Sequence, residues 1–239
     1  LRMESEGGIY HVINRGNYRA DVFATARTKS AFLNCLDQAC EKTGWKIHAW
    51  CVMSNHYHLA VETPQANLVD GMSWLQGTFA TRFNRLRKEN GHLFQGRYKS
   101  LVVDPDQGLG GVCHYIHLNP VATGIVDDPA EYSWSGHLDL LGKRRKPIVD
   151  VDEVLRVFGR TRRSARAAYV RRIKGAVEEE WIGEEPGRLP WWRLGRPPKA
   201  DLEDPEDAVR KRREKDQMGP MWRPEVDVDT FVSKLSEFL

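Results

Sequence analysis

The stretch WCVMSNHYHLAV, residues 50–61, decides how the rest of the chain is interpreted. Apolar residues flank its centre on both sides, which is typical of strands, and Ser54-Asn55 favours a turn between them. Side chains on a strand alternate with a period of two, so His56 and His58 leave the same face. Two neighbouring imidazoles on a rigid element suit a divalent metal ion. We therefore predict a metal site, over the alternative of two unrelated histidines on a half-exposed sheet face.

Strands and helices surround this stretch in a recognisable order. Period-two or apolar runs predict strands, and apolar stripes at helical spacing predict helices. The predicted order is strand 8–14, helix 28–42 between a Thr28 cap and a Gly44 stop, strand 46–53, the histidine strand, helix 67–88 and strand 97–103. Strand 46–53 and the histidine strand are expected to pair as a hairpin. The order predicts an α+β fold, a ferredoxin-like four-stranded antiparallel sheet with helices on one face. We expect the other face to be free for binding.

Two other segments could add chemistry to the histidine pair. A short helix is predicted after the glycine-rich residues 108–111 and should end at Asn119, because a residue before proline is disfavoured in a helix. Tyr115 lies four residues before Asn119 and shares its helical face. A tyrosine hydroxyl could attack a phosphodiester if a metal ion offset the developing charge. His11 on the first strand could be a third ligand, although a core or surface role is favoured for an isolated histidine.

The overall composition excludes several classes of protein. The 239 residues, 41% of them hydrophobic, suffice for one large domain plus an extension, and the net charge of +3 is small. The four cysteines lack C-x-x-C spacing, which indicates reduced thiols and not a disulfide framework or a zinc knuckle. No apolar run approaches the ~18 residues of a membrane span. The first residues lack the apolar core of a signal peptide. We expect a cytoplasmic protein.

Positive charge is concentrated locally. Between residues 70 and 99 six basic residues face two acidic ones, a net charge of +4. Such a cluster suits phosphate contacts, and the alternative is an ordinary solvated helix end. The predicted nucleic-acid contacts combine this cluster with the turn after the first strand, and they are Arg15, Asn17, Arg82, Arg85, Arg97 and Lys99.

Residues 146–239 are predicted to form a helical and linker-rich C-terminal extension after a first domain over residues 1–145. Helices are expected over residues 152–158 and 164–177. Five of the twelve prolines fall in residues 186–205, which predicts an extended linker. Three shorter features complete the extension: a GRPPK segment (195–199) of the kind that enters minor grooves, a basic run (210–215) and a short amphipathic helix from Asp229.

Four separated blocks of sequence resemble one known family. They are NRGNYRADVF (14–23), MSNHYHLAVETP (53–64), FNRLRKENGHLFQGRYKS (83–100) and YIHLNPVATGIV (115–126). In this order they resemble the REP-associated tyrosine transposases, part of the wider group of single-tyrosine transposases with a histidine-hydrophobic-histidine motif. The resemblance implies that residues 1–145 are a ferredoxin-like catalytic domain. It also implies Mg²⁺ or Mn²⁺ as cofactor and the cutting and joining of single-stranded DNA at REP-type hairpins, by a monomer or a homodimer.

The resemblance implies a role for each matching residue. His56 and His58 would be the metal ligands, and Tyr115 would be the nucleophile that forms a 5′-phosphotyrosine bond. Asn119 stands where relatives supply a third ligand, often glutamine, and its alternative role is to close the helix. Tyr57, between the two histidines, is expected to be a packing residue.

The favoured function is therefore a metal-dependent single-stranded DNA endonuclease and strand transferase. The main alternative is a non-catalytic module that holds hairpin DNA or RNA by stacking on its sheet. The histidine pair and Tyr115 argue against that alternative. A metal-dependent hydrolase that uses water is disfavoured, because the sequence lacks a dense carboxylate set for two metals.

Overall fold

The computed structural model describes residues 4–104 and 108–178 of the chain. A four-stranded sheet has the order β2-β3-β1-β4, and every neighbouring pair is antiparallel. The predicted α+β fold and the hairpin of the second and third strands are confirmed. The strands are β1 (Gly8–Arg15), β2 (Lys46–Val52), β3 (His56–Thr63) and β4 (Lys99–Val103). The helices are α1 (Ala26–Thr43), α2 (Leu68–Arg87), α3 (Leu109–Ala122), α4 (His137–Leu140), α5 (Val151–Arg156) and α6 (Arg162–Glu178), with 3-10 turns η1 (Asn17–Arg19) and η2 (Pro129–Glu131).

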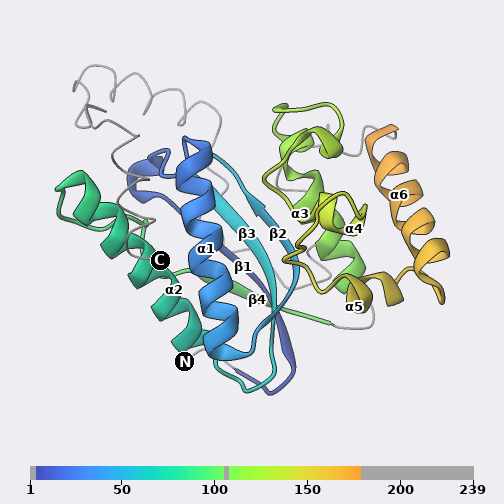
Figure 1. The fold of residues 1–239 in the computed structure, drawn as a ribbon, viewed down its shortest axis with the longest axis horizontal. Coiled ribbons are helices and arrows are strands. Elements are labelled where there is room, and N and C mark those ends of the chain that lie inside the picture. Colours follow the sequence, from blue (N-terminus) through green and yellow to red (C-terminus); the bar gives the residue numbers. More distant parts are fainter. Residues whose placement is uncertain (1–3, 105–107, 179–239) are drawn as a thin grey trace.

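Helices α1 and α2 lie side by side on one face of the sheet (Figure 1). Aromatic rings fill the space beneath them. Phe32 of α1 lies 4.6 Å from the Tyr57 ring of β3 and 5.4 Å from the Phe79 ring of α2, measured between centroids. Tyr57 is fully buried, and its hydroxyl accepts a hydrogen bond from Gln76 of α2. The predicted packing role of Tyr57 is confirmed.

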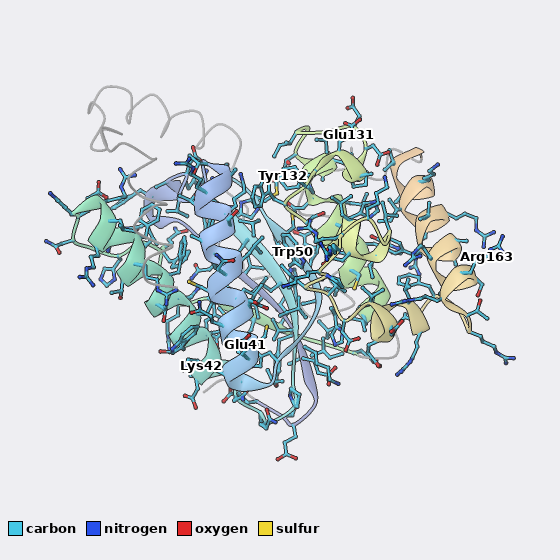
Figure 2. The ribbon with its side chains drawn as sticks, viewed as in Figure 1. Glu41, Lys42, Trp50, Glu131, Tyr132 and Arg163 are labelled. Atoms are coloured by element: carbon cyan, nitrogen blue, oxygen red, sulfur yellow. The ribbon has the colours of Figure 1, made fainter. Side chains whose placement is uncertain are left out.

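The prediction that the second face of the sheet is free for binding was wrong, because helices cover part of it. Helix α3 packs over β2 and β3, and α4, α5 and α6 lie beyond it (Figure 1). Its buried residues Val112 and Ile116 need an apolar partner, and the sheet supplies one. Trp50 of β2, in the middle of Figure 2, is fully buried and hydrogen-bonds Asp139 of α4. The sheet is therefore covered on both sides at its β2 edge.

Capping residues set the ends of the first helix, and pairing with β1 sets the start of the last strand. Thr25, and not Thr28, caps α1, and the two threonines form a reciprocal capping box. Gly44 ends α1 in the left-handed conformation, as predicted. Strand β4 begins at Lys99 instead of residue 97, because β1 offers it partners only from Ile13 to Ile9.

Helix α3 does not end at Asn119. It runs through Pro120 to Ala122, and the backbone N–H and hydroxyl of Thr123 both bond the Asn119 carbonyl. A proline in the last turn disrupts little of the hydrogen-bond ladder, so the preference of its predecessor is overridden. Asn119 consequently lies inside the helix, on the same side as Tyr115, and does not close it.

Two helices of the predicted extension, α5 and α6, are present. Val154, Leu155, Tyr169 and Ile173 belong to the same hydrophobic core as the sheet residues. The first part of the extension thus packs against α3, while the predicted boundary at residue 145 stays a prediction. The linker, the GRPPK segment, the basic run and the helix from Asp229 fall outside the described residues. Within the described ranges no helix combines the length and apolar character that crossing a bilayer requires.

Two glycines of α2 should respond oppositely to alanine. A Cβ at Gly71 would overlap the buried Trp45 ring, whereas a Cβ at Gly77 would meet no atom within 4 Å. Gly71→Ala should lower the free energy of unfolding by about 1–3 kcal/mol through overpacking. Gly77→Ala should raise it by about 0.5–1 kcal/mol, because alanine is the better helix former. Urea unfolding of both variants measures the difference, and equal effects would contradict this packing.

Candidate active site

Strand pairing places three histidines on the face of the sheet that α3 covers. In the β1–β3 register Arg15 opposes His56 and Ile13 opposes His58. Directly opposed residues share a face of the sheet, so Arg15 and Ile13 lie on the same face as the two histidines. His11 lies two residues before Ile13 and therefore points the same way. The ring centroids of His56 and His58 are 5.1 Å apart, and those of His11 and His58 are 5.3 Å apart. The three imidazoles form one cluster.

Hydrogen bonds fix the His58 ring. Its Nδ1 lies 3.1 Å from His11 Nε2, and its Nε2 lies 3.3 Å from Asn119 Nδ2. An amide nitrogen can only donate, so Nε2 of His58 is the acceptor and Nδ1 carries the proton toward His11. This assignment leaves the lone pair of His58 on Nε2, directed at α3.

Asn55 orients His56 in a similar manner. Asn55 Oδ1 lies 2.6 Å from His56 Nδ1, and an amide oxygen can only accept, so Nδ1 is the protonated nitrogen. The lone pair of His56 is then also on Nε2. Asn119 hydrogen-bonds His58, and it also lies close enough to His56 to raise the pKa of that imidazole against the larger lowering by burial. Both rings therefore present an unprotonated nitrogen, and one amide reaches both of them.

Tyr115 completes the cluster from α3. Its half-buried ring lies edge-on to His58 and to His11, with centroids 5.5 Å apart in each case. Asn119 follows one turn later on the same helical face, as the spacing predicts. The structure thus brings together Tyr115, Asn119 and the two histidines, while their predicted chemical roles stay predictions.

Burial keeps these imidazoles neutral. Desolvation lowers the pKa of His11 to about 4, and desolvation followed by the charge of Arg15 lowers that of His56 to about 4. The pKa of His58 lies well below its ordinary value because of burial and then its histidine neighbours. Neutral imidazole is the form that can bind a metal ion. The ring nitrogens are therefore available as ligands throughout the neutral pH range.

Comparison with known proteins supports the same family that the four sequence blocks suggested. The family described as "Transposase IS200 like" matches residues 5–119. Those residues are similar to an IS200-like transposase domain. The resemblance to tyrosine transposases is confirmed, and the chain is an enzyme of that type. The matched residues include the whole sheet, the histidine pair and Tyr115.

Two similar proteins extend the comparison beyond the transposase domain. A Haemophilus influenzae protein described as a REP-associated tyrosine transposase is 24% identical over 144 residues, covering 52% of this chain and 82% of that protein. A solved REP-associated tyrosine transposase, bound to a REP hairpin, aligns with a TM-score of 0.53 at 17% identity. That alignment covers 63% of this chain and 91% of the other. At this identity the solved structure establishes the shared fold.

Two imidazoles and one amide of this cluster are the side chains that could supply ligands to a metal ion. Among the described residues no group of three or more His, Cys, Asp or Glu side chains is arranged to hold an ion. A metal site at this position would consist of His56 Nε2, His58 Nε2 and Asn119 Oδ1, once the Asn119 amide turned its Nδ2 away from His58. Such a mixed nitrogen and oxygen set fits Mn²⁺ or Mg²⁺ with positions left for phosphate oxygens. The donor chemistry is compatible with the metals that the resemblance implied.

Four of the six predicted DNA contacts gather at one end of the sheet of the transposase domain. The backbone N–H of Gln95 donates to the Arg15 carbonyl at 2.9 Å, and that of Asn17 donates to the Leu93 carbonyl at 2.9 Å. Residues 91–97 therefore run beside the turn after β1. This pairing brings four of the predicted contact residues to the end of the sheet that holds His56. These four residues are Arg15, Asn17, Arg97 and Lys99.

The other two predicted contacts lie on α2 of the transposase domain, in the helical layer. Arg82 is hydrogen-bonded to Gln38 and to the Cys35 thiol of α1, and Arg85 is exposed one turn further along. These arginines share the helical layer over the opposite face of the sheet from Tyr115. The basic residues that looked continuous in sequence therefore fall in two places, the end of the sheet and the helical layer.

Sequence reasoning undervalued two residues of the transposase site, His11 and Asn55. His11 is buried, as favoured, but it also bonds the His58 ring. Its period-two position on β1 was visible in the sequence, whereas the register that brings it beside His58 was not. Asn55 was interpreted only as a turn residue, although its side chain also orients His56.

Acid should destabilise the protein through these buried histidines. The pKa of His11 is 6.5 in the unfolded chain and about 4 in the folded protein. Between these two pH values His11 therefore takes up a proton when the protein unfolds. The free energy of unfolding should therefore fall as pH falls through that window, by about 3 kcal/mol for His11 alone. His114 and His137, with pKa values lowered by burial to about 3 and about 4, act in the same direction.

Urea unfolding in metal-free buffer from pH 7.5 to pH 4.5 measures this dependence. His11→Gln removes one titrating group and should flatten the curve. A wild-type curve that is flat over the window, or an unchanged slope in the variant, would contradict the assignment of neutral buried imidazoles.

Proposed function

We propose that the protein is a metal-dependent single-stranded DNA endonuclease and strand transferase that acts at hairpin sequences of the REP type. The observation that carries this proposal is the Tyr115 ring, 5.5 Å from the ring of His58. A potential nucleophile and a potential metal ligand meet there on rigid elements. The similar structure that holds a REP hairpin supports hairpin DNA as the partner.

His56 and His58 would hold Mg²⁺ or Mn²⁺ through their Nε2 atoms, together with Asn119. When bound, the ion supplies positive charge that polarises the scissile phosphate. His11 and Asn55 keep the two rings in the tautomers that present Nε2, an outer-shell role known to raise metal affinity. The charge of Arg15 lowers the pKa of both histidines. The same charge adds positive potential where phosphate would lie.

Tyr115 would attack the scissile phosphorus with its hydroxyl oxygen. The phenol loses its proton, a bond forms between that oxygen and phosphorus, and the bond from phosphorus to the 3′-oxygen of the upstream strand breaks. The departing 3′-oxygen gains a proton and becomes a free 3′-hydroxyl, and a 5′-phosphotyrosine remains on the protein. One ester replaces another, so a new 3′-hydroxyl can reverse the step and join strands without ATP.

The strand would lie along the end of the sheet, where phosphates could contact Arg15, Asn17, Arg97 and Lys99. Arg82 and Arg85 are proposed as further contacts on α2, for a part of the DNA that extends past the sheet. The cytoplasmic location and the choice between monomer and homodimer stay predictions from the sequence.

Incubation with a labelled single-stranded hairpin and Mn²⁺, followed by denaturing electrophoresis, tests the proposal. We expect a covalent protein–DNA band that EDTA prevents. Hairpin binding without a band, and without any effect of metal, would favour the non-catalytic binding module. Cleaved DNA without a band would favour attack by water.

A further inference from the structure

A tyrosine of α6 lies at the centre of a second, wholly buried polar cluster. Tyr169 has no exposed surface. Its hydroxyl lies 2.9 Å from His117 Nδ1 and 2.6 Å from His137 Nδ1. Its ring stacks on His114, with centroids 5.6 Å apart and planes inclined by 14°. One side chain thus contacts three histidines from two other helices.

Two of these histidines belong to the helix that carries Tyr115. His114 comes directly before Tyr115 on α3, and His117 comes two residues before Asn119. At 100° per residue both point away from the face that Tyr115 and Asn119 present to His58. Helix α3 is therefore held on one side by the histidines of the sheet and on the other by Tyr169.

The hydrogen bonding of Tyr169 is specific. A phenol hydroxyl donates one hydrogen bond and accepts another, so one histidine Nδ1 receives its proton while the other donates to it. Both His117 and His137 are buried, and water cannot replace the hydroxyl without rearrangement. A shift or rotation of α3 would break the bond to His117 and leave a buried polar atom unpaired. The cluster consequently favours one orientation of α3.

Apolar packing encloses the cluster. The Phe158 ring lies 5.4 Å from Tyr169 and 5.3 Å from His114 between centroids. On the opposite side of α6, Arg163 projects away from α3, as Figure 2 shows. Helix α6 lies wholly after residue 119, where the match to the transposase family ends. The contact is thus made by a segment outside the matched domain.

We propose that Tyr169 is a positioning residue, which fixes the orientation of α3 and so sets Tyr115 and Asn119 against the histidine pair. This inference rests on the proposed function for its effect on catalysis. Its structural content, that the Tyr169 hydroxyl restrains α3, does not. Tyr169 itself touches neither the histidine pair nor the site of the DNA.

Tyr169→Phe tests the inference, because it keeps the stacked ring and removes only the hydroxyl. With saturating hairpin and Mn²⁺, adduct formation should slow by at least about tenfold, since small misplacements of a reacting group are costly. The hairpin Kd should stay within about twofold, because Tyr169 is fully buried in α6 and cannot contact the DNA. Hydrogen exchange of the α3 amides, measured without DNA, should become faster.

Tyr132→Phe is the matched control. The Tyr132 hydroxyl is also buried and donates to the Val52 carbonyl at 2.8 Å, away from the three histidines. This variant should keep the wild-type adduct rate and the wild-type exchange of α3. His117→Leu, a second variant, breaks the same contact from the other side and should slow adduct formation similarly. Combined with Tyr169→Phe it should cause no further loss, because both remove one interaction.

The outcomes separate this inference from the proposed function. An unchanged adduct rate with unchanged α3 exchange in Tyr169→Phe would overturn it, and so would an equal loss in Tyr132→Phe. If the wild type forms no adduct at all, the proposed function fails. Faster α3 exchange in Tyr169→Phe, but not in Tyr132→Phe, would then still support the restraint of α3, and equal exchange would reject it.

Discussion

Tyr115→Phe should abolish the covalent DNA adduct and leave hairpin binding nearly unchanged. Phenylalanine keeps the ring edge against His58 and His11 but removes the oxygen that would attack phosphorus. We expect the rate of strand cleavage to fall by more than about a thousandfold, with a hairpin Kd within about twofold of wild type. Single-turnover cleavage and fluorescence anisotropy on the same hairpin measure the two quantities.

Tyr18→Phe is a suitable control for this experiment. Tyr18 is the most accessible tyrosine of the described residues, with 76% of its surface exposed, so it is a natural site for accidental attack. The Tyr18→Phe variant should cleave the hairpin at the wild-type rate. Normal cleavage with an adduct in Tyr115→Phe would move the nucleophile to another residue, and normal cleavage without an adduct would support a water-dependent hydrolase.

His58→Ala should give the second largest effect. The change removes an Nε2 lone pair from the donor set and leaves His11 and Asn119 without the ring that they bond. We expect Mn²⁺ affinity to fall by at least about tenfold and adduct formation by more than about a hundredfold. Isothermal titration with Mn²⁺ and adduct formation at fixed metal concentration measure the two losses.

His92→Ala is the matched control, because His92 is exposed and lies outside the histidine cluster. It should bind Mn²⁺ as the wild type does. Unchanged Mn²⁺ affinity in His58→Ala would contradict the proposed ligand set, even if activity were lost. Adduct formation that is insensitive to EDTA in the wild type would contradict the need for a metal.

Local periodicity predicted the parts of the site that lie on single elements. The period of two on a strand placed His56 and His58 on one face, and the spacing of four on a helix placed Tyr115 with Asn119. These relations need no knowledge of tertiary structure. The order of strands and helices was similarly sufficient for the fold class and the sheet.

Relations between elements could not be predicted from such patterns. His11 reaches His58 only through the β1–β3 register, and the Asn119 amide reaches His58 only through the packing of α3 on the sheet. Arg82 and Arg97 looked like parts of one basic cluster, yet Arg82 is hydrogen-bonded to α1 in the helical layer, whereas Arg97 belongs to the segment that runs beside the turn after β1. The partners of Tyr169 depend on how α6 packs, which no spacing in the sequence indicated.

Peptide mapping of the covalent adduct tests the central claim most directly. The wild-type protein is incubated with a hairpin and Mn²⁺, digested with protease and nuclease, and analysed by mass spectrometry. We predict a nucleotide joined through its 5′-phosphate to the peptide that contains Tyr115, with fragment ions that assign it to that tyrosine. A nucleotide on any other residue, or DNA cleavage with no modified peptide, would contradict the assignment of Tyr115 as the nucleophile beside the histidine pair.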